Sequence, residues 1–210
     1  MPEAQAQKKK IMKNLTTDKE ISFEEICTLL KQGKCVVLPT DTTYGLVAWT
    51  GAKEALKNLN TAKANPQAKP PQVLCTFEQA LKYANFDDKA LKAAKTFWPG
   101  ALTLVLNSSQ LAKSFLPIET VGLRVPDNDL ILKIMKELGS GLFSSSANKH
   151  GQGYTPDLKL ITKVFAPQNI AVIDGISKGK SSSVIDMTKD EPLFLRTGQI
   201  TEEKFKKAVL

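Results

Sequence analysis

The sequence predicts an α/β protein with a single domain, in which a twisted mixed β-sheet is flanked by helices. Three observations lead to this prediction. The chain has 210 residues, a length that suits one domain of ordinary size. Apolar, β-branched runs alternate with helical segments early in the chain, and strand-like runs cluster near its end. Hydrophobic residues make up 42% and charged residues 24%, both close to the globular average, which argues against a disordered chain or a coiled coil.

The N-terminal residues differ in composition from the rest of the chain. Residues 1–20 are polar and contain the lysine cluster at 8–10 together with Lys13. Because such a segment has little apolar surface to bury, we expect residues 1–20 to form a flexible basic arm. The folded domain is then expected over residues 21–210.

Capping signals and helix breakers define the expected helices. Ser22 and Glu25 form a capping box, and Thr76 and Gln79 repeat the pattern. Thr155 precedes a proline, as an N-cap does when proline takes the first helical position. The helices are expected over residues 22–33, 52–61, 77–84, 88–98, 128–138, the segment that begins at Thr155-Pro156, and the residues after Thr201.

Short apolar runs define the expected strands. The first, at residues 35–39, is interrupted by the polar stretch from Thr40 to Gly45. The strands are expected over residues 35–39, 71–76, 101–106, 122–125, 142–145, 171–174, 183–186 and 193–196. Early alternation with helices and late clustering of strands together favour a mixed sheet.

The scarcity of histidine and cysteine excludes several kinds of site. His150 is the single histidine, and no GxSxG elbow is present, so neither an imidazole-based metal centre nor a Ser-His-Asp triad is supported. Cys27, Cys35 and Cys75 are too few and too scattered for a disulfide framework, which indicates reduced thiols. We expect no tightly bound metal, and we expect His150 to be a loop or surface residue.

The overall charge and the absence of long apolar runs indicate compartment and partners. There is no run of about 18 apolar residues and no apolar stretch of a secretory signal, so we expect a cytoplasmic protein that does not contact a membrane. The net charge of +8 favours polyanionic partners such as nucleotides or RNA.

Four polar, turn-rich segments follow expected strands and contain many hydroxyls, glycines and cations. Strand ends in open α/β sheets are where ligands bind, so together the segments predict an anion-binding cleft, although the same residue types also make ordinary loops. The segment 175–181 lacks the Walker spacing and precedes a strand, so it is not a P-loop, and no GxGxxG fingerprint occurs. The four segments cover residues 39–45, 144–153, 174–183 and 195–199.

Four cationic residues are candidates for holding an anion. Lys63 and Lys69 flank a proline-rich turn, where they could grip a triphosphate or simply be surface lysines. Arg124 and Arg196 lie in strand-like runs, and a buried arginine needs an anionic partner because an unpaired buried charge is very costly. That partner could be a carboxylate of the protein or an anionic group of a ligand.

Seven collinear motifs, from about residue 22 to residue 202, resemble the YrdC-type threonylcarbamoyl-AMP synthases. Each motif is weak alone, but seven in one order and spacing are specific. The resemblance implies the YrdC-like fold in its stand-alone, single-domain form, without the additional C-terminal domain of longer members. The motifs are PTDTTYGL (39–46), the Lys63…Pro66…Lys69-Pro70 loop, FWPGALTLVL (97–106), VGLRVP (121–126), SSSAN (144–148), SSVID (182–186) and LRTGQI (195–200).

The resemblance implies an enzyme, a nucleotidyltransferase that makes threonylcarbamoyl-AMP and pyrophosphate from L-threonine, bicarbonate and ATP. A separate transferase machinery would then use the product to modify adenosine in tRNA, and the chain itself could contact tRNA. Carbamoylated threonine would attack the α-phosphorus, a step that depends on alignment and charge stabilisation rather than on a protein nucleophile. Mg²⁺ is expected to arrive with ATP, bridging its phosphates and water rather than occupying a cage of protein ligands.

The motif positions imply a role for each site residue. Lys63 and Arg124 would be the catalytic residues. The L-threonine pocket would consist of Thr42, Arg124, Ser144 and Ser182. The ATP-binding residues would be Lys63, Asn65, Lys69, Thr120, Ser146, Asn148, Tyr154 and Arg196.

The lysine loop departs from the family pattern. The family usually reads K-x-R-P, whereas this chain has Asn65 at the arginine position. Asparagine cannot supply the fixed positive charge that arginine brings to a triphosphate, which leaves open a weak enzyme or a different substrate. The segment 70–72, Pro-Pro-Gln, is also less apolar than expected at the start of a strand.

A second class of function stays open on the same fold, a non-catalytic module that binds tRNA or double-stranded RNA. The basic charge, the lysine-rich arm and Asn65 favour it. Against it, only 7% of residues are aromatic, and no aromatic cluster for base stacking is visible. RNA affinity that depends on charge should fall steeply with salt.

Overall fold

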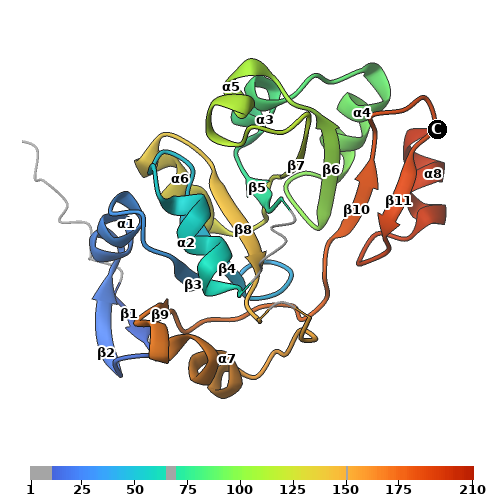
Figure 1. Ribbon diagram of the computed structural model, residues 1–210. Helices are drawn as coiled ribbons and strands as arrows, with labels where there is room; N and C mark the ends of the chain where they lie inside the picture. The colour runs from blue at the N-terminus through green and yellow to red at the C-terminus, as the bar shows by residue number, and fades with distance from the viewer. Residues whose placement is uncertain (1–10, 65–69, 150) are drawn as a thin grey trace, which may run out of the picture.

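The computed structural model describes residues 11–64, 70–149 and 151–210, and a twisted sheet dominates it (Figure 1). The strands of this sheet are β3 (Val36–Leu38), β4 (Gly45–Trp49), β5 (Gln72–Leu74), β6 (Leu102–Asn107), β7 (Thr120–Arg124), β8 (Leu142–Ser146), β9 (Ala171–Val172), β10 (Ser183–Asp186) and β11 (Leu193–Arg196). Their order across the described sheet is β11-β10-β6-β7-β5-β8-β4-β3-β9. Parallel pairs join β10 to β6, β5 to β7 and β3 to β9, while the other pairs are antiparallel, so the predicted mixed sheet is confirmed.

Most helices begin and end where the capping signals placed them. Ser22 and Glu25 form the predicted capping box, as do Thr76 and Gln79, and Thr201 caps the last helix. Gly139 ends its helix with φ of +73°, a left-handed conformation that glycine adopts without a Cβ clash. The helices are α1 (Phe23–Lys31), α2 (Ala55–Ala62), α3 (Phe77–Tyr83), α4 (Asp88–Phe97), α5 (Gln110–Phe115), α6 (Asp129–Leu138), α7 (Leu158–Phe165), the 3₁₀ helix η1 (Ala166–Gln168) and α8 (Glu202–Val209).

Two apolar clusters cover the two faces of the central strands. Alternate side chains of a strand point to opposite faces, so Val37 joins one cluster while Val36 and Leu38 join the other. The first cluster includes residues of α2, α3, α4, α5, α7 and α8, and the second includes residues of α1 and α6. Because helices cover both faces here, β3 is apolar along its whole length, with Val36, Val37 and Leu38 all buried.

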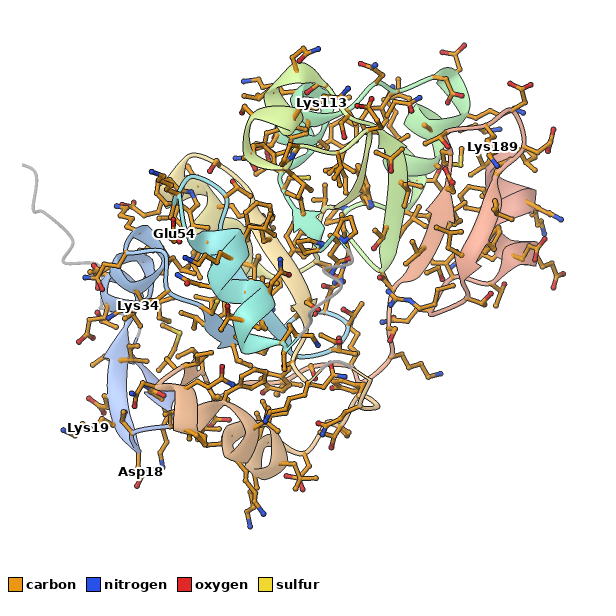
Figure 2. The ribbon with its side chains drawn as sticks, in the orientation of Figure 1. Asp18, Lys19, Lys34, Glu54, Lys113 and Lys189 are labelled. Atoms are coloured by element: carbon orange, nitrogen blue, oxygen red, sulfur yellow. The ribbon has the colours of Figure 1, made fainter. Side chains whose placement is uncertain are left out.

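The N-terminal prediction is wrong for residues 11–20. The strands β1 (Ile11–Asn14) and β2 (Lys19–Ser22) form an antiparallel hairpin, with Asp18 and Lys19 pointing away from the ribbon at its turn (Figure 2). The hairpin is attached to the rest of the fold by backbone bonds, since Leu15 N donates to Val172 O at 2.8 Å. The two strands were not predicted because each has only four residues and the segment contains many polar and charged side chains. Residues 1–10, including the lysine cluster at 8–10, lie outside the described residues.

The start of α7 is also corrected. Asp157, rather than Thr155, is the N-cap, and its carboxylate accepts from the backbone N–H of Lys159 at 2.8 Å. Aspartate is as good a cap as threonine, and here the helix begins after the proline instead of on it. The strand β4 and the helix α5 had no sequence prediction. In the described part of the chain, every helix is too short or too polar to cross a lipid bilayer.

Candidate functional site

A pocket of about 530 Å³ lies on the sheet face that carries Thr120, Gly122 and Arg124. Most of the residues that the sequence placed at a site line this one pocket, although they come from seven different segments of the chain. They are Thr42, Lys63, Thr120, Arg124, Ser144, Ser146, Asn148, Tyr154, Ser182 and Arg196. Three further residues from the sequence analysis, Asn65, Lys69 and His150, lie outside the described residues.

The strand alternation explains how the sheet builds this pocket. On β7, Val121 and Leu123 are buried in the core, while Thr120, Gly122 and Arg124 line the pocket. On β5 and β8, one face of each strand is apolar at one end and polar at the other. Leu74 and Leu142 belong to the cluster with α1 and α6. Gln72 and Ser144, on the same face, line the pocket. The pocket therefore lies where this sheet face is no longer covered by those two helices.

Arg124 is a fully buried cation with a partner from the protein. Its side chain is 2% exposed, and Nη2 forms an ion pair with the Asp41 carboxylate. Nη1 donates to Thr42 Oγ1 at 2.8 Å, and Nε donates to Gly100 O at 3.1 Å. Burial lowers the pKa of Arg124 and the neighbouring carboxylate opposes that shift, so the guanidinium stays charged. Of its five N–H groups three are bound, which leaves one on each terminal nitrogen for a ligand.

The β3–β4 loop is organised by threonine hydroxyls. Thr40 Oγ1 donates to Thr43 O at 2.7 Å, so its single proton is used. The 2.9 Å contact between Thr40 and Thr42 hydroxyls must then take its proton from Thr42. Since Thr42 Oγ1 also accepts from Arg124, it retains one lone pair and can only accept from a ligand.

A second loop, residues 174–182, crosses over the β3–β4 loop and binds it in two places. Tyr44 Oη donates to Gly175 O at 2.5 Å, and Gly179 N donates to Thr42 O at 2.7 Å. Burial and the nearby Asp174 carboxylate raise the pKa of Tyr44 to about 12, so its hydroxyl stays protonated and able to donate. These bonds fix Thr42 between the sheet and the loop that leads to Ser182.

Lys63, at the C-terminal end of α2, is held without a carboxylate. It is 6% exposed, and its Nζ donates to Ser146 O at 2.8 Å, to Asn148 Oδ1 at 2.9 Å and to Asn148 O. All three ammonium protons are thus bound to neutral oxygens, and within the described residues Lys63 forms no ion pair. Burial lowers the pKa of Lys63 from 10.5 to about 8.

Arg196 reaches the pocket through a β-bulge. On β10, Val184 and Ile185 are consecutive, but their partners on β11 are Arg196 and Phe194, so Leu195 is an extra residue. The bulge lets Phe194 pack against Phe205 of α8 while Arg196 lines the pocket. Without it, residues two apart on a strand would share one face. Across the described ranges Arg196 forms no ion pair, and its bonds go to Ser182 O at 2.9 Å and to Ser182 Oγ at 3.0 Å.

Three residues that shape the site had no role in the sequence analysis: Gln72 and Thr103 line the pocket, and Asp41 pairs with Arg124 without lining it. Asp41 lies within the PTDTTYGL motif and had no assigned role, although the argument that a buried arginine needs an anion could have pointed to it. Thr103 bonds Ser182 Oγ at 2.9 Å and donates to Gln72 Oε1, also at 2.9 Å. The only signal for Gln72 and Thr103 was that each is polar in an otherwise apolar strand.

The charges of the described pocket suit an anion better than a metal. No group of three or more histidine, cysteine, aspartate or glutamate side chains that could hold a metal ion is present in residues 11–64, 70–149 and 151–210. Lys63 is buried and bonds neutral oxygens, whereas Arg196 is an exposed residue, not the buried arginine considered from the sequence, and bonds Ser182; among the described residues neither has a carboxylate partner. Such an arrangement attracts phosphate or carboxylate groups.

Comparison with known proteins gives consistent matches over most of the chain. The family model Sua5_yciO_yrdC, described as "Telomere recombination", matches residues 28–198. Threonylcarbamoyl-AMP synthase of Pyrococcus abyssi is 32% identical over 186 residues, which is 86% of this chain and 55% of that protein. The Bacillus subtilis protein of the same name is 31% identical over 92% of this chain and 58% of its own length. The chain thus spans somewhat more than half the length of these two relatives.

Solved structures extend the comparison to the fold. The structure of P. abyssi Sua5 complexed with L-threonine has a TM-score of 0.82 at 30% identity, covering 89% of this chain and 57% of that chain. Escherichia coli YciO has a TM-score of 0.75 at 23% identity, covering 87% of this chain and 92% of that chain, and so supports the fold alone. The expected YrdC-like fold is confirmed, and the chain belongs to the Sua5/YciO/YrdC family.

Proposed function

We propose that the pocket forms threonylcarbamoyl-AMP and pyrophosphate from L-threonine, bicarbonate and ATP, as a nucleotidyltransferase. The observation that carries the proposal is the pair of pocket cations without a carboxylate partner in the described chain, Lys63 and Arg196. A site that keeps two such charges near neutral oxygens is prepared for a polyanionic substrate, and a triphosphate supplies the charge that the protein lacks. The relatives named threonylcarbamoyl-AMP synthase support the same reaction.

L-threonine suits the end of the pocket around Arg124. The two remaining N–H groups of the guanidinium, one on each terminal nitrogen, can donate to the two oxygens of a carboxylate. Thr42 Oγ1, which can only accept, suits the amino group of the same ligand. Ser144 and Ser182 supply further hydroxyls on either side.

ATP suits the two pocket cations that have no carboxylate partner among the described residues, Lys63 and Arg196. A phosphate oxygen that approaches Lys63 would replace one of the three oxygens that hold its ammonium group, which gives a stronger bond because the new partner is charged. Ser146, Asn148, Thr120 and Tyr154 line the same pocket and can bind the rest of the nucleotide. Asn65 and Lys69 belong to the proposed phosphate-binding set on the sequence pattern alone.

The reaction needs alignment more than a protein nucleophile. The neutral amino group of threonine would attack the carbon of bicarbonate to give a carbamate with loss of water. An oxygen of the carbamate then attacks the α-phosphorus of ATP, and the bond to pyrophosphate breaks. Lys63 and Arg196 would stabilise the charge that builds on the phosphate oxygens. Mg²⁺ would enter bound to ATP and supply charge neutralisation between its phosphates. We place the reaction in the cytoplasm, ahead of a separate transferase that modifies tRNA.

The test is pyrophosphate release by the purified chain with Mg²⁺-ATP and bicarbonate, with and without L-threonine, followed by mass identification of the product. We expect release that depends on threonine and a product with the mass of threonylcarbamoyl-AMP. Binding of ATP and threonine without release would refute the catalytic proposal. Absence of both binding and release, with RNA affinity that falls as salt is raised, would favour the RNA-binding module instead.

A further inference from the structure

We infer that Gln72 determines specificity for the amino-acid substrate, by donating from its side-chain Nε2 to an oxygen on the substrate's side chain. The inference rests on the proposed function for the nature of the ligand. Its starting point is the strand order, in which β5 lies between β7, which carries Arg124, and β8, which carries Ser144. A ligand that reaches from Arg124 to Ser144 must therefore pass over β5.

Gln72 is the residue of β5 that such a ligand meets. Val73 and Leu74 are fully buried in the two core clusters, whereas Gln72 lines the pocket. Its register partner on β8 is Ser144. On the other side Gly122 keeps the space open, because a Cβ there would stand 3.6 Å from Thr103 Cγ2 and 3.9 Å from Gln72 Cβ.

A chain of hydrogen bonds orients the amide of Gln72. Arg196 Nη2 donates to Ser182 Oγ at 3.0 Å, Ser182 and Thr103 hydroxyls lie 2.9 Å apart, and Thr103 Oγ1 donates to Gln72 Oε1 at 2.9 Å. With Oε1 occupied by the Thr103 hydroxyl, the amide turns Nε2 to the pocket. That nitrogen has no protein partner in the described part of the chain, so its two N–H groups remain for a ligand.

The chemistry of a free amino acid decides which atom these donors meet. Its ammonium group is itself a donor and cannot accept, and its carboxylate is placed at Arg124. The remaining acceptor of L-threonine is the side-chain hydroxyl. A site built to bond a substrate hydroxyl rejects the analogue that lacks it, because the buried donor is then left unpaired.

The experiment compares direct binding of L-threonine and L-valine, which has a methyl group in place of the hydroxyl, by calorimetry on the full chain. We expect the wild-type protein to bind threonine about 5- to 10-fold more tightly than valine, the range of one neutral hydrogen bond. Gln72→Leu should bring the ratio close to one. Gln72→Glu, which keeps an oxygen for Thr103 and replaces the donor nitrogen, should weaken threonine binding further by repelling its carboxylate.

The control is Gln110→Leu, because Gln110 is exposed at the start of α5 and does not line the pocket. A threonine-to-valine ratio that is the same in wild-type and Gln72→Leu protein would overturn the inference, as would equal affinity for both amino acids in the wild type. Failure of the proposed function looks different. In that case the ratio and its loss in Gln72→Leu would persist while no pyrophosphate is released.

Discussion

Arg124 and Lys63 line one pocket and both are buried cations, but among the described residues only Arg124 has a carboxylate partner. Arg124 has the Asp41 carboxylate as its partner, while Lys63 has three neutral oxygens from Ser146 and Asn148. Both pKa values are lowered by burial, but only Arg124 has a neighbouring carboxylate that opposes the shift.

This difference in partners predicts that Arg124 matters mainly for the stability of the fold and Lys63 mainly for ligand binding. A buried ion pair contributes little beyond its own desolvation cost, but removal of one partner leaves an unpaired charge and is strongly destabilising. A buried lysine without a counter-charge behaves differently. Its charge lowers the stability of the unliganded protein, and it strengthens the binding of an anion. The surroundings of Arg124 should therefore be stable without ligand, whereas the charge of Lys63 should be stabilised only when an anion binds.

The largest expected effect comes from removing the carboxylate that pairs with Arg124. Asp41→Asn keeps the size of the side chain but removes the charge that pairs with Arg124, so the guanidinium is left buried and unpaired. We expect the free energy of unfolding to fall by about 3–5 kcal/mol, measured by urea denaturation.

The matched control for this change is an exposed pair. Lys113 and Glu119 lie 2.6 Å apart, with side chains 30% and 86% exposed, and Glu119→Gln should cost no more than about 1 kcal/mol. Equal losses for the two variants would show that the Arg124–Asp41 pair is not the buried, tightly coupled interaction described above.

The next effect concerns Lys63 and its role in binding ATP. Lys63→Met removes a charge that no carboxylate in the described part of the chain compensates, and it keeps most of the length of the side chain. We expect stability to stay the same or rise, while ATP binding or turnover falls by about 100-fold or more, as when one well-placed charge donor is lost. Isothermal titration with ATP and thermal unfolding of the same samples measure both quantities.

A lysine on the exposed side of the same helix is the control for Lys63. Lys57 is 77% exposed and pairs with Glu54 on the surface, so Lys57→Met should change neither quantity appreciably. If Lys63→Met instead destabilised the protein and left ATP affinity intact, Lys63 would be a structural residue and the proposed contrast would be wrong.

The predictable parts of the fold are those with local causes. The capping boxes at Ser22 and Thr76 are formed by residues three positions apart, and both lie where the sequence placed them. The hairpin of β1 and β2 depends on distant partners such as Val172, and the bulge at Leu195 depends on pairing with β10. Neither has a local signature in sequence, which explains why the first was predicted wrongly and the second was missed.

The site follows the same division. Most of the site residues named from the motifs line the pocket, and Thr42, Ser146 and Arg196 do so because they follow or end a strand. Lys63 reaches the same pocket from the end of α2. The sequence left open whether Arg124 pairs with protein or ligand, and the structure assigns Asp41. The partners of Lys63 could not be foreseen, since two of its three acceptors are backbone oxygens, which any residue would supply.

The smallest expected effect is the pH dependence that Lys63 gives to anion binding and to stability. Burial lowers the pKa of Lys63 to about 8, and a bound anion favours the charged form and raises it again, so binding is coupled to protonation. Affinity for tripolyphosphate should be level below about pH 8 and then fall by up to about tenfold per pH unit. Above pH 8 the unfolded chain holds the Lys63 proton more tightly than the folded one, so stability of the unliganded protein should rise over the same interval. In Lys63→Met both trends should vanish, and a decline in affinity that persists in this variant would assign the titration to another group.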